Sequence, residues 1–267
     1  STDADVLLGM VERWRAGMLY CIPAVWERIL DCKRGYDTRS LYFVNSGTSR
    51  VEPELIERLR GRFPGTYMGV HYGSTEMGRG LSIGDSDIAR KPYSVGLSIM
   101  GVESRIVEGE LWQRGLSQAS GYFDLPQQSA DSFQDGWYLT GDLVERDGEG
   151  YYTITGRRRE IIRSGGETIA PAEVEASLAD FPGVRDVAIV GLPDPRWGEV
   201  ICAALVIEEG GAVPSVEALR AHLDGRLSAF KHPRKAVAVD SLPRTPATGQ
   251  IQRSQVRDRI LNLDGAS

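Results

Sequence analysis

The chain has 267 residues, of which 41% are hydrophobic and 25% charged, and its formal net charge is −6. This composition is typical of a globular protein with one or two domains, and the acidic balance argues against a nucleic-acid partner. The three cysteines show no metal-binding or redox spacing, and no apolar run reaches the ~20 residues that span a bilayer. Residues 1–14 carry acids where a signal peptide needs bases. We therefore expect a cytoplasmic protein whose first residues come from the interior of a longer chain.

Short apolar runs alternate with helical patterns up to about residue 90. Strands are predicted at 18–22, 41–44 and 67–70, and helices at 24–30 and 54–63. This alternation is typical of a parallel α/β sheet, in which ligands bind at the carboxyl ends of strands. Two polar loops, 45–49 and 71–76, follow predicted strands and are expected at that edge.

The pattern changes after residue 94. Short β-like runs separated by glycines predict a β-barrel-like layer over 94–156. Residues 156–166 are basic and glycine-bearing, which is typical of a hinge. A compact α+β unit follows, with helices at 172–178, 216–227 and 253–261 and strands at 187–191, 200–207 and 236–239. We therefore predict a large domain, 1–156, made of an α/β part and a β-rich part, and a small mobile α+β domain, 157–267.

The pentapeptide Tyr72–Gly–Ser–Thr–Glu76 follows the third predicted strand. A functional interpretation places Thr75 on a phosphate and Glu76 on a magnesium ion, because Mg²⁺ prefers oxygen ligands and usually bridges substrate phosphates. A helix start capped by Ser74 or Thr75 fits the same residues.

The stretch from 138 to 175 combines a carboxylate, arginines and paired glycines. Asp142 could accept two ribose hydroxyls, and Arg157 could reach the same diol or a phosphate. Gly165 and Gly166 let the backbone approach a ligand or pivot. Taken singly, these features also fit an Asx turn, a solvated charged face and a tight turn. Trp197 fits a packing role, and residues 242–253 fit a linker before the last helix.

Taken in order, these segments resemble the adenylate-forming superfamily of acyl- and aryl-CoA ligases, nonribosomal adenylation domains and luciferases. The resemblance covers essentially the whole chain and is carried by YGSTE, YLTGD, GRRREIIRSGGETIAPAEVE, PDPRWGE and PRTPATGQIQR. Stand-alone acyl-CoA ligases are the most similar members. The resemblance implies that a small-molecule carboxylic acid reacts with ATP to give an acyl-adenylate and pyrophosphate. The thiol of coenzyme A, or of a carrier-protein pantetheine, then takes the acyl group.

The resemblance also implies a role for each matching residue. Thr75 and Glu76 would be catalytic together with position 250, with Glu76 on Mg²⁺ and Arg159 as the hinge. Gly69 and Val70 would line part of the acyl pocket, and Lys231 and Arg234 would either meet CoA phosphates or be solvated. ATP, AMP or CoA would be bound by Thr48, Ser49, Arg50, His71, Tyr72, Gly73, Ser74, Thr75, Asp142, Ile154, Arg157, Gly165 and Gly166.

Two departures from the family pattern affect the expected activity. The family's phosphate loop with its lysine does not occur in this sequence, so the chain is expected to correspond to the second half of a member and to be inactive alone. Gln250 stands where the family has a lysine that bridges the carboxylate and the α-phosphate. By analogy with removing an oxyanion donor, this loss is about 3 kcal/mol, or ~10²-fold in rate. The alternatives are an adenylate-binding or regulatory relative that has lost adenylation, and a ligase that loads a carrier protein.

Overall fold

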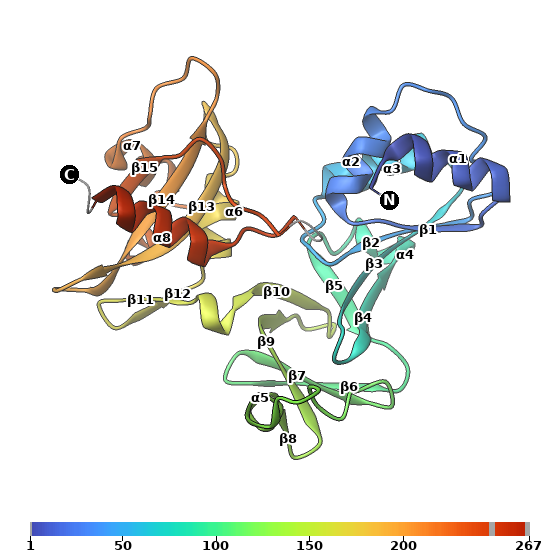
Figure 1. Ribbon diagram of the computed structural model, residues 1–267, viewed down its shortest axis with the longest axis horizontal. Coiled ribbons are helices and arrows are strands. Elements are labelled where there is room, and N and C mark those ends of the chain that lie inside the picture. The colour runs from blue at the N-terminus through green and yellow to red at the C-terminus, as the bar shows by residue number, and fades with distance from the viewer. Residues whose placement is uncertain (1, 246–248, 265–267) are drawn as a thin grey trace. The chain divides into compact units, whose positions relative to one another are not determined.

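The computed structural model describes residues 2–245 and 249–264. The chain divides into two compact units, Ser1–Ile154 and Thr155–Ser267 (Figure 1). The first unit contains most of a ten-stranded sheet, and the second contains a five-stranded sheet. In the described part of the chain, no helix is both long and apolar enough to cross a membrane.

Helices cover one face of the first four strands (Figure 1). β1, β2 and β3 run parallel to one another, and β4 and β5 are antiparallel. The side chains of Val44, Met68 and Val70 pack with the helices in one core. These strands are β1 (Met18–Tyr20), β2 (Phe43–Gly47), β3 (Tyr67–Ser74), β4 (Gly78–Gly84) and β5 (Ser94–Ser98). The helices are α1 (Ala4–Trp14), α2 (Pro23–Asp31), α3 (Pro53–Arg62) and the short α4 (Asp85–Ile88).

Local chemistry sets the starts of the helices. Asp3 caps α1 by accepting a hydrogen bond from the Val6 backbone N–H at 3.0 Å. α2 and α3 each begin at a proline, whose fixed φ suits the first helical position. The helices predicted at 24–30 and 54–63 are confirmed, because α2 spans Pro23–Asp31 and α3 spans Pro53–Arg62.

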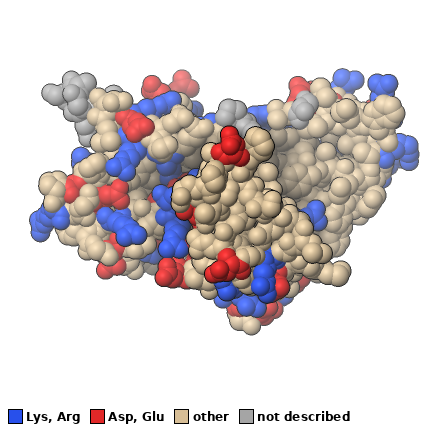
Figure 2. Space-filling model, turned by 60° about the horizontal axis from the view of Figure 1, so that its bottom comes forward, with Lys and Arg blue, Asp and Glu red and all other residues tan. Residues whose placement is uncertain are grey.

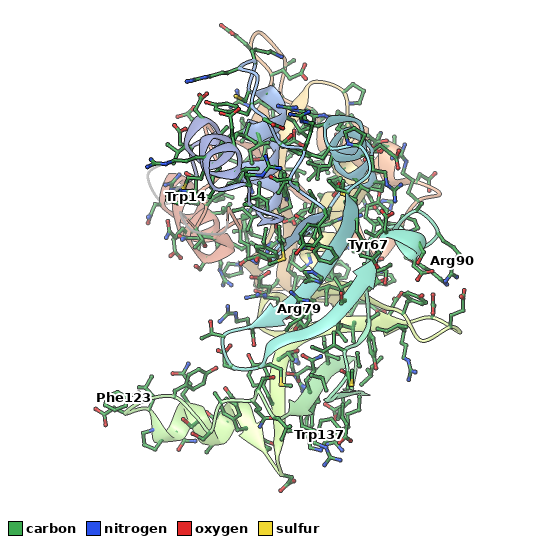
Figure 3. The ribbon with its side chains drawn as sticks, turned by 90° about the vertical axis from the view of Figure 1, so that its right-hand side faces the viewer. Trp14, Tyr67, Arg79, Arg90, Phe123 and Trp137 are labelled. Carbon is green, nitrogen blue, oxygen red and sulfur yellow. The ribbon has the colours of Figure 1, made fainter. Side chains whose placement is uncertain are left out.

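The β-rich part of the first unit continues the same sheet. Across it the strands run β1-β2-β3-β4-β5-β10-β9-β7-β6, and β8 pairs with β9. The predicted mixed α/β class is confirmed, and the β-rich layer is part of an open sheet instead of a closed barrel. Figure 3 shows Phe123 at the outer end of the segment that enters α5, where it is 98% exposed. These elements are β6 (Val102–Val107), β7 (Glu110–Gly115), α5 (Pro126–Ser132), β8 (Phe133–Gln134), β9 (Trp137–Arg146) and β10 (Tyr152–Arg157).

The second unit is a sheet with helices on both faces. Its strand order is β12-β11-β14-β13, and β15 pairs with β14. Successive residues of β13 face opposite sides, so Ile189 packs with α6 and α7 while Val190 packs with α8. The elements are η1 (Arg158–Glu160), β11 (Ile162–Ser164), β12 (Glu167–Ile169), α6 (Pro171–Leu178), β13 (Val184–Asp194), β14 (Gly198–Ile207), α7 (Val216–Leu223), η2 (Ala229–Lys231), β15 (Lys235–Ala238) and α8 (Arg253–Asp264).

Several predicted boundaries are wrong for identifiable reasons. β2 continues through residues 45–47 and β3 through 71–74, because backbone pairing with neighbouring strands extends over these polar residues. The first strand ends at Tyr20 instead of residue 22, and Pro23 then opens α2. The helix predicted to reach residue 227 ends at Leu223, shortly before Gly225, whose φ is +74°.

Candidate functional site

The hairpin between β3 and β4 carries the first group of predicted site residues. Residues 71–74 lie on β3, and Thr75 and Glu76 lie in the turn. The Ser74 hydroxyl accepts a hydrogen bond from the Met77 backbone N–H at 3.2 Å and so stabilises the turn. Because the chain continues directly into β4, the alternative prediction of a capped helix start is wrong.

The Glu76 carboxylate is bound by a tyrosine from a distant segment. The Tyr122 hydroxyl donates to Glu76 Oε1 at 2.8 Å, and the Glu76 carbonyl oxygen accepts from the Ala119 N–H at 2.7 Å. Burial acts to raise the pKa of Glu76, but its hydrogen bonds, that of Tyr122 first, lower the pKa below its ordinary value. Glu76 is therefore a negative charge stabilised by a neutral donor, next to the exposed Thr75.

Asp142 lies in a bulge of β9. Leu139 pairs with Trp112 and Leu143 pairs with Glu110, so three residues of β9 stand opposite one residue of β7. The prediction of a simple Asx turn is therefore wrong. Bulges redirect side chains and are frequent beside active sites. Asp142 is 8% exposed.

The bulge is stabilised by its neighbours in the sheet. Gly141 has φ +71°, a conformation that favours glycine, and its N–H donates to Glu110 Oε1 at 2.8 Å. The Thr140 hydroxyl donates to the Leu111 carbonyl oxygen at 2.7 Å and accepts from the Asp142 N–H at 3.1 Å. These contacts fix the backbone on both sides of the carboxylate.

The structure brings Tyr72 and Asp142 together across 70 residues of sequence. The Tyr72 hydroxyl donates to Asp142 Oδ2 at 2.6 Å. Burial first, and then the Asp142 charge, raise the pKa of Tyr72 far above its ordinary value, so Tyr72 is a permanent donor. Tyr72 and Ile154, both predicted to contact the nucleotide, pack against the same small core of Leu81, Leu111, Val144 and Tyr152. The YGSTE motif, the YLTGD motif and the end of the β-rich part therefore meet around Tyr72.

His71 is the centre of a buried chain of neutral hydrogen bonds. Its Nε2–H donates to Asn45 Oδ1 at 2.9 Å, so its Nδ1 accepts from the Ser82 hydroxyl at 2.8 Å. Burial, with a smaller effect of Arg79, lowers the pKa of His71 to about 4. The Tyr20 ring is almost parallel to the His71 ring, with 6.5 Å between their centroids. His71 is therefore an uncharged ring with a fixed orientation.

The segment after β2 lies on the surface. Thr48 has φ +71°, and its Oγ1 shares a hydrogen bond of 3.0 Å with the Tyr20 hydroxyl. Arg50 pairs with Glu52 at 3.0 Å, and its guanidinium lies 4.0 Å from the centroid of the Tyr93 ring. Tyr20 thus links this segment to His71.

Gly69 and Val70 lie on opposite faces of β3. Val70 is buried with the helices, so it does not share a surface with Gly69. A Cβ at Gly69 would lie 2.5 Å from Asn45 Oδ1, which keeps this position a glycine. The two residues face different sides because successive side chains of a strand alternate, and their place in an acyl pocket stays a prediction.

In the second unit, the paired glycines form a hairpin turn. Gly165 and Gly166 have φ of +61° and +87° and join β11 to β12, as a type I′ turn requires. Gly165 N–H donates to the Trp197 carbonyl oxygen at 2.9 Å, and a Cβ at Gly165 would lie 2.6 Å from the Trp197 ring. The Arg234 guanidinium lies over that ring at 4.1 Å. Trp197 therefore packs, as predicted, between the turn and a cation.

The remaining predicted residues also lie in the second unit. Arg157 ends β10, and Arg159 is exposed in η1. Gln250 is half-buried, and its carbonyl oxygen accepts from the Thr245 N–H at 2.8 Å. Residues 246–248 of the tail motif lie outside the described residues. Lys231 pairs with Glu173 at 2.5 Å, so it is not a merely solvated cation.

The oxygen ligands that Glu76 and Thr75 offer fit a magnesium ion that also binds a substrate phosphate. Within residues 2–245 and 249–264, no group of three His, Cys, Asp or Glu side chains could hold a metal ion. Magnesium usually takes one or two carboxylates, with waters and substrate phosphates completing its octahedron. The Glu76 carboxylate and Thr75 hydroxyl supply the hard oxygen atoms that such a site needs.

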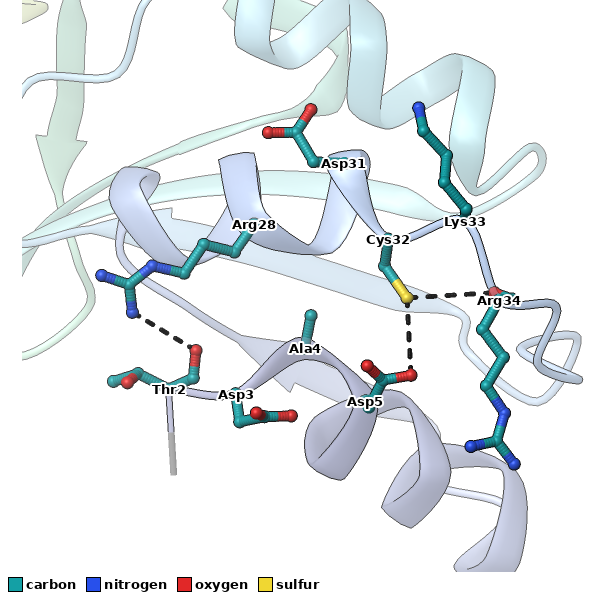
Figure 4. Close-up of a pocket in the computed structure, with 9 residues that line it drawn as sticks. All are labelled: Thr2, Asp3, Ala4, Asp5, Arg28, Asp31, Cys32, Lys33 and Arg34. Atoms are coloured by element: carbon teal, nitrogen blue, oxygen red, sulfur yellow. Dashed lines mark hydrogen bonds between the residues drawn. The ribbon is translucent and has the colours of Figure 1, made fainter.

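A polar pocket of about 530 Å³ lies elsewhere in the first unit, between the start of α1 and the end of α2 (Figure 4). The Cys32 Sγ lies 3.8 Å from Asp5 Oδ1, and Arg28 donates to the Thr2 carbonyl oxygen at 3.4 Å. None of the predicted site residues lines this pocket. On the face that Figure 2 shows, acidic and basic side chains are interspersed.

Two family models match the chain. The AMP-binding enzyme model matches residues 1–123, and the AMP-binding enzyme C-terminal domain matches residues 173–248. The chain belongs to the adenylate-forming, AMP-binding enzyme family. It spans about half the length of the curated relatives that it matches.

The relatives of this AMP-binding enzyme chain include ligases of aromatic acids. It is 35% identical to the indoleacetate–CoA ligase of Aromatoleum aromaticum over 97% of the chain and 52% of the relative. It is 33% identical to a feruloyl-CoA synthase of Amycolatopsis over 97% of the chain and 55% of the relative.

Solved structures of the family share its fold. The amide bond synthetase McbA of Marinactinospora thermotolerans superposes with a TM-score of 0.84 at 30% identity, covering 97% of this chain and 55% of that one. The o-succinylbenzoate CoA synthetase of Bacillus subtilis, in complex with its acyl-adenylate, gives 0.81 at 28% identity, with 96% and 54% covered.

Sequence reasoning missed the partners of the predicted residues. Tyr122, which binds Glu76, lies in no segment that we singled out, and Asn45, which binds His71, lies in the polar loop 45–49 but was given no role. Tyr138 is 6% exposed, and the nearby Glu76 and Asp142 charges contribute to raising its pKa after burial. No local signal identifies these partners, because each contact joins segments that are distant in the sequence.

Proposed function

We propose that this AMP-binding enzyme activates a carboxylic acid with ATP and transfers the acyl group to coenzyme A. The observation that carries the proposal is the buried Asp142 carboxylate, set in a bulge and bonded by Tyr72 from the YGSTE motif. A fixed carboxylate is the acceptor that a ribose diol requires. The acid attacks the α-phosphate and releases pyrophosphate, and the thiol then attacks the acyl carbon and releases AMP.

The first unit would hold the nucleotide. We assign the adenine to the surface near His71, Tyr72 and residues 48–50, the ribose to Asp142, and a phosphate to Thr75. Glu76 would hold magnesium, which when bound offsets the charge of the phosphate oxygens. The lowered pKa of Glu76 supports this role, because the group is ionised at neutral pH.

The second unit would act as the small mobile domain, with Arg157 assisting at the ribose and Arg159 as the hinge. The thiol would pass along the turn at Gly165 and Gly166. The absence of side chains at this turn supports that assignment, because a ligand can approach the backbone closely there and a Cβ at Gly166 would meet nothing within 4 Å.

We propose an organic acid with an aromatic or fatty acyl group as the substrate. Relatives of this chain are named as ligases of indoleacetate and ferulate and of medium- and long-chain fatty acids. Aromatic acids are the first choice for testing, because those two relatives are 35% and 33% identical to the chain, against 30% for the fatty-acid ligase.

Gln250 favours a second candidate function. A neutral amide cannot offset the negative charge that develops during adenylation, so the protein could bind an adenylate without forming one efficiently. On this view Gln250→Lys raises the adenylation rate by about 10²-fold. The thioester-forming step should change less.

Pyrophosphate release decides between these functions. It is measured on this chain and on the longest product of its gene, with indoleacetate, ferulate and a medium-chain fatty acid, with and without Gln250→Lys. Release together with an acyl-CoA product supports the ligase. No release from any form, including the lysine variant, rules the ligase out. Release without thioester formation on CoA favours a ligase that loads a carrier protein.

A further inference from the structure

One arginine of the second unit binds carboxylates from two other segments. Arg253 is the first residue of α8. Its Nη1 lies 2.5 Å from Glu160 Oε2 in η1. Its Nε and Nη2 donate to the two oxygens of Glu175 in α6, at 3.0 and 2.5 Å. In the sequence, Arg253 lies 78 residues after Glu175 and 93 residues after Glu160.

The cluster is largely shielded from water. The side chains of Arg253, Glu160 and Glu175 are 18%, 25% and 13% exposed. Glu175 Oε1 also accepts from the Ile189 N–H at 2.8 Å, which fixes it to β13. Burial acts to lower the pKa of Arg253, but Glu175 and Glu160 raise it, so the guanidinium is always charged. A planar guanidinium bonded to both oxygens of Glu175 has one orientation.

This cluster is close in sequence to two residues with proposed roles, the hinge residue Arg159 and Gln250. Glu160 follows Arg159 directly in η1, and Arg253 comes three residues after Gln250. The Gln250 segment is held by two backbone bonds of 2.8 Å, from Thr245 N–H to the Gln250 carbonyl oxygen and from Gln252 N–H to that of Pro243. α8 thus begins at Arg253, directly after residues 249–252.

We propose that Arg253 is a positioning residue that fixes the hinge turn η1 and the Gln250 segment to the core of the second unit. Through Glu160 it holds residues 158–160, and through Glu175 it holds α6 and β13. Residues 158–160 and 249–252 then move as one body with the sheet. The inference concerns the order of these segments, so it stands or falls separately from the acid, the thiol and the adenylation activity.

Hydrogen exchange of the 267-residue chain, followed by mass spectrometry, tests the proposal. In Arg253→Met, the amides of 158–161 and of 249–252 should both exchange about tenfold faster or more, because residues 158–161 lose the Arg253–Glu160 bond and residues 249–252 lose the anchoring of the residue that follows them. Amides of β13 and β14 should stay protected. The matched control is Arg257→Met, which removes the Arg257–Glu199 pair one turn further along α8 and should leave residues 158–161 unchanged.

Two further variants keep the proposal falsifiable if Arg253→Met fails to fold. Glu160→Gln keeps the Arg253–Glu175 bonds and should accelerate exchange at 158–161 only. Arg253→Lys keeps the charge but loses the fork, so it should restore part of the protection. The proposal is wrong if Glu160→Gln leaves 158–161 unchanged, or if Arg253→Met and Arg257→Met accelerate the same peptides equally.

Discussion

The two units stabilise their buried and half-buried carboxylates in different ways. In the first unit, Tyr72 donates to Asp142 and Tyr122 donates to Glu76, and both donors are neutral hydroxyls. In the second unit, Arg253 donates three hydrogen bonds to Glu160 and Glu175. A hydroxyl donates a hydrogen bond to a carboxylate and leaves its negative charge in place. A guanidinium donates hydrogen bonds and also neutralises that charge.

The difference separates ligand binding from scaffolding. A carboxylate that keeps its charge can attract a magnesium ion, as we propose for Glu76. A carboxylate neutralised by Arg253 instead holds segments of the chain together. His71 follows the first pattern, because its chain of bonds to Asn45 and Ser82 is uncharged. Four measurements test this distinction, beginning with the largest expected effect.

Loss of Glu175 should cost the most. Glu175→Ala leaves Arg253 with one of its two carboxylates and the Ile189 N–H without its acceptor, so we expect a loss of about 3 kcal/mol in the free energy of unfolding. Urea unfolding of the chain measures it. Glu167→Ala, at an exposed position of β12, is the control and should change stability by no more than about 0.5 kcal/mol. Equal effects of the two variants would show that the ion cluster is not structural.

His71 should make stability depend on pH. Its pKa is about 4 in the folded protein, so the unfolded chain binds more protons as the pH falls below about 6.5. This contribution to stability is complete well above that pH and is lost progressively down to about pH 4, with about 2.5 kcal/mol lost at pH 4.5. Thermal unfolding at pH 7.5 and 4.5 measures the loss, which should be smaller in His71→Gln. An identical pH dependence in both proteins would contradict a buried neutral histidine.

Tyr72→Phe removes a donor to the buried Asp142. We expect a cost of about 1.5 kcal/mol, because this hydrogen bond joins a charged group. Denaturant unfolding gives the value, and Tyr93→Phe, whose tyrosine is 42% exposed, is the control. A cost no larger than that of the control would show that the 2.6 Å bond contributes nothing to stability.

Tyr122→Phe should have the smallest effect on stability, about 1 kcal/mol, because Glu76 is only half-buried. Its clearer effect is on the pKa of Glu76, which should rise when the Tyr122 hydroxyl no longer stabilises the charge. A carboxylate NMR titration measures it. An unchanged Glu76 pKa would mean that Tyr122 does not maintain the negative charge of the turn.

Local patterns predicted the elements well where one residue dictates the backbone. Pro23 and Pro53 begin helices, and Gly165 with Gly166 forms a turn. The same reasoning failed where pairing with another strand decides the conformation. β3 includes His71 and its polar neighbours, and Asp142 lies in a bulge of a strand that was not predicted. Nearby residues such as Gly141 permit the bulge, but pairing with the neighbouring strands decides both outcomes.

By itself, the sequence determined the family of this protein, its mixed α/β class and the positions of its motifs, because these depend on residue order and local conformational preference. The tertiary structure alone decided which groups meet. Tyr72 reaches Asp142 across 70 residues, Tyr122 reaches Glu76 across 46, and Arg253 reaches Glu160 across 93. Such contacts arise when the whole core packs, and no local pattern specifies which distant hydroxyl or guanidinium will satisfy a buried carboxylate.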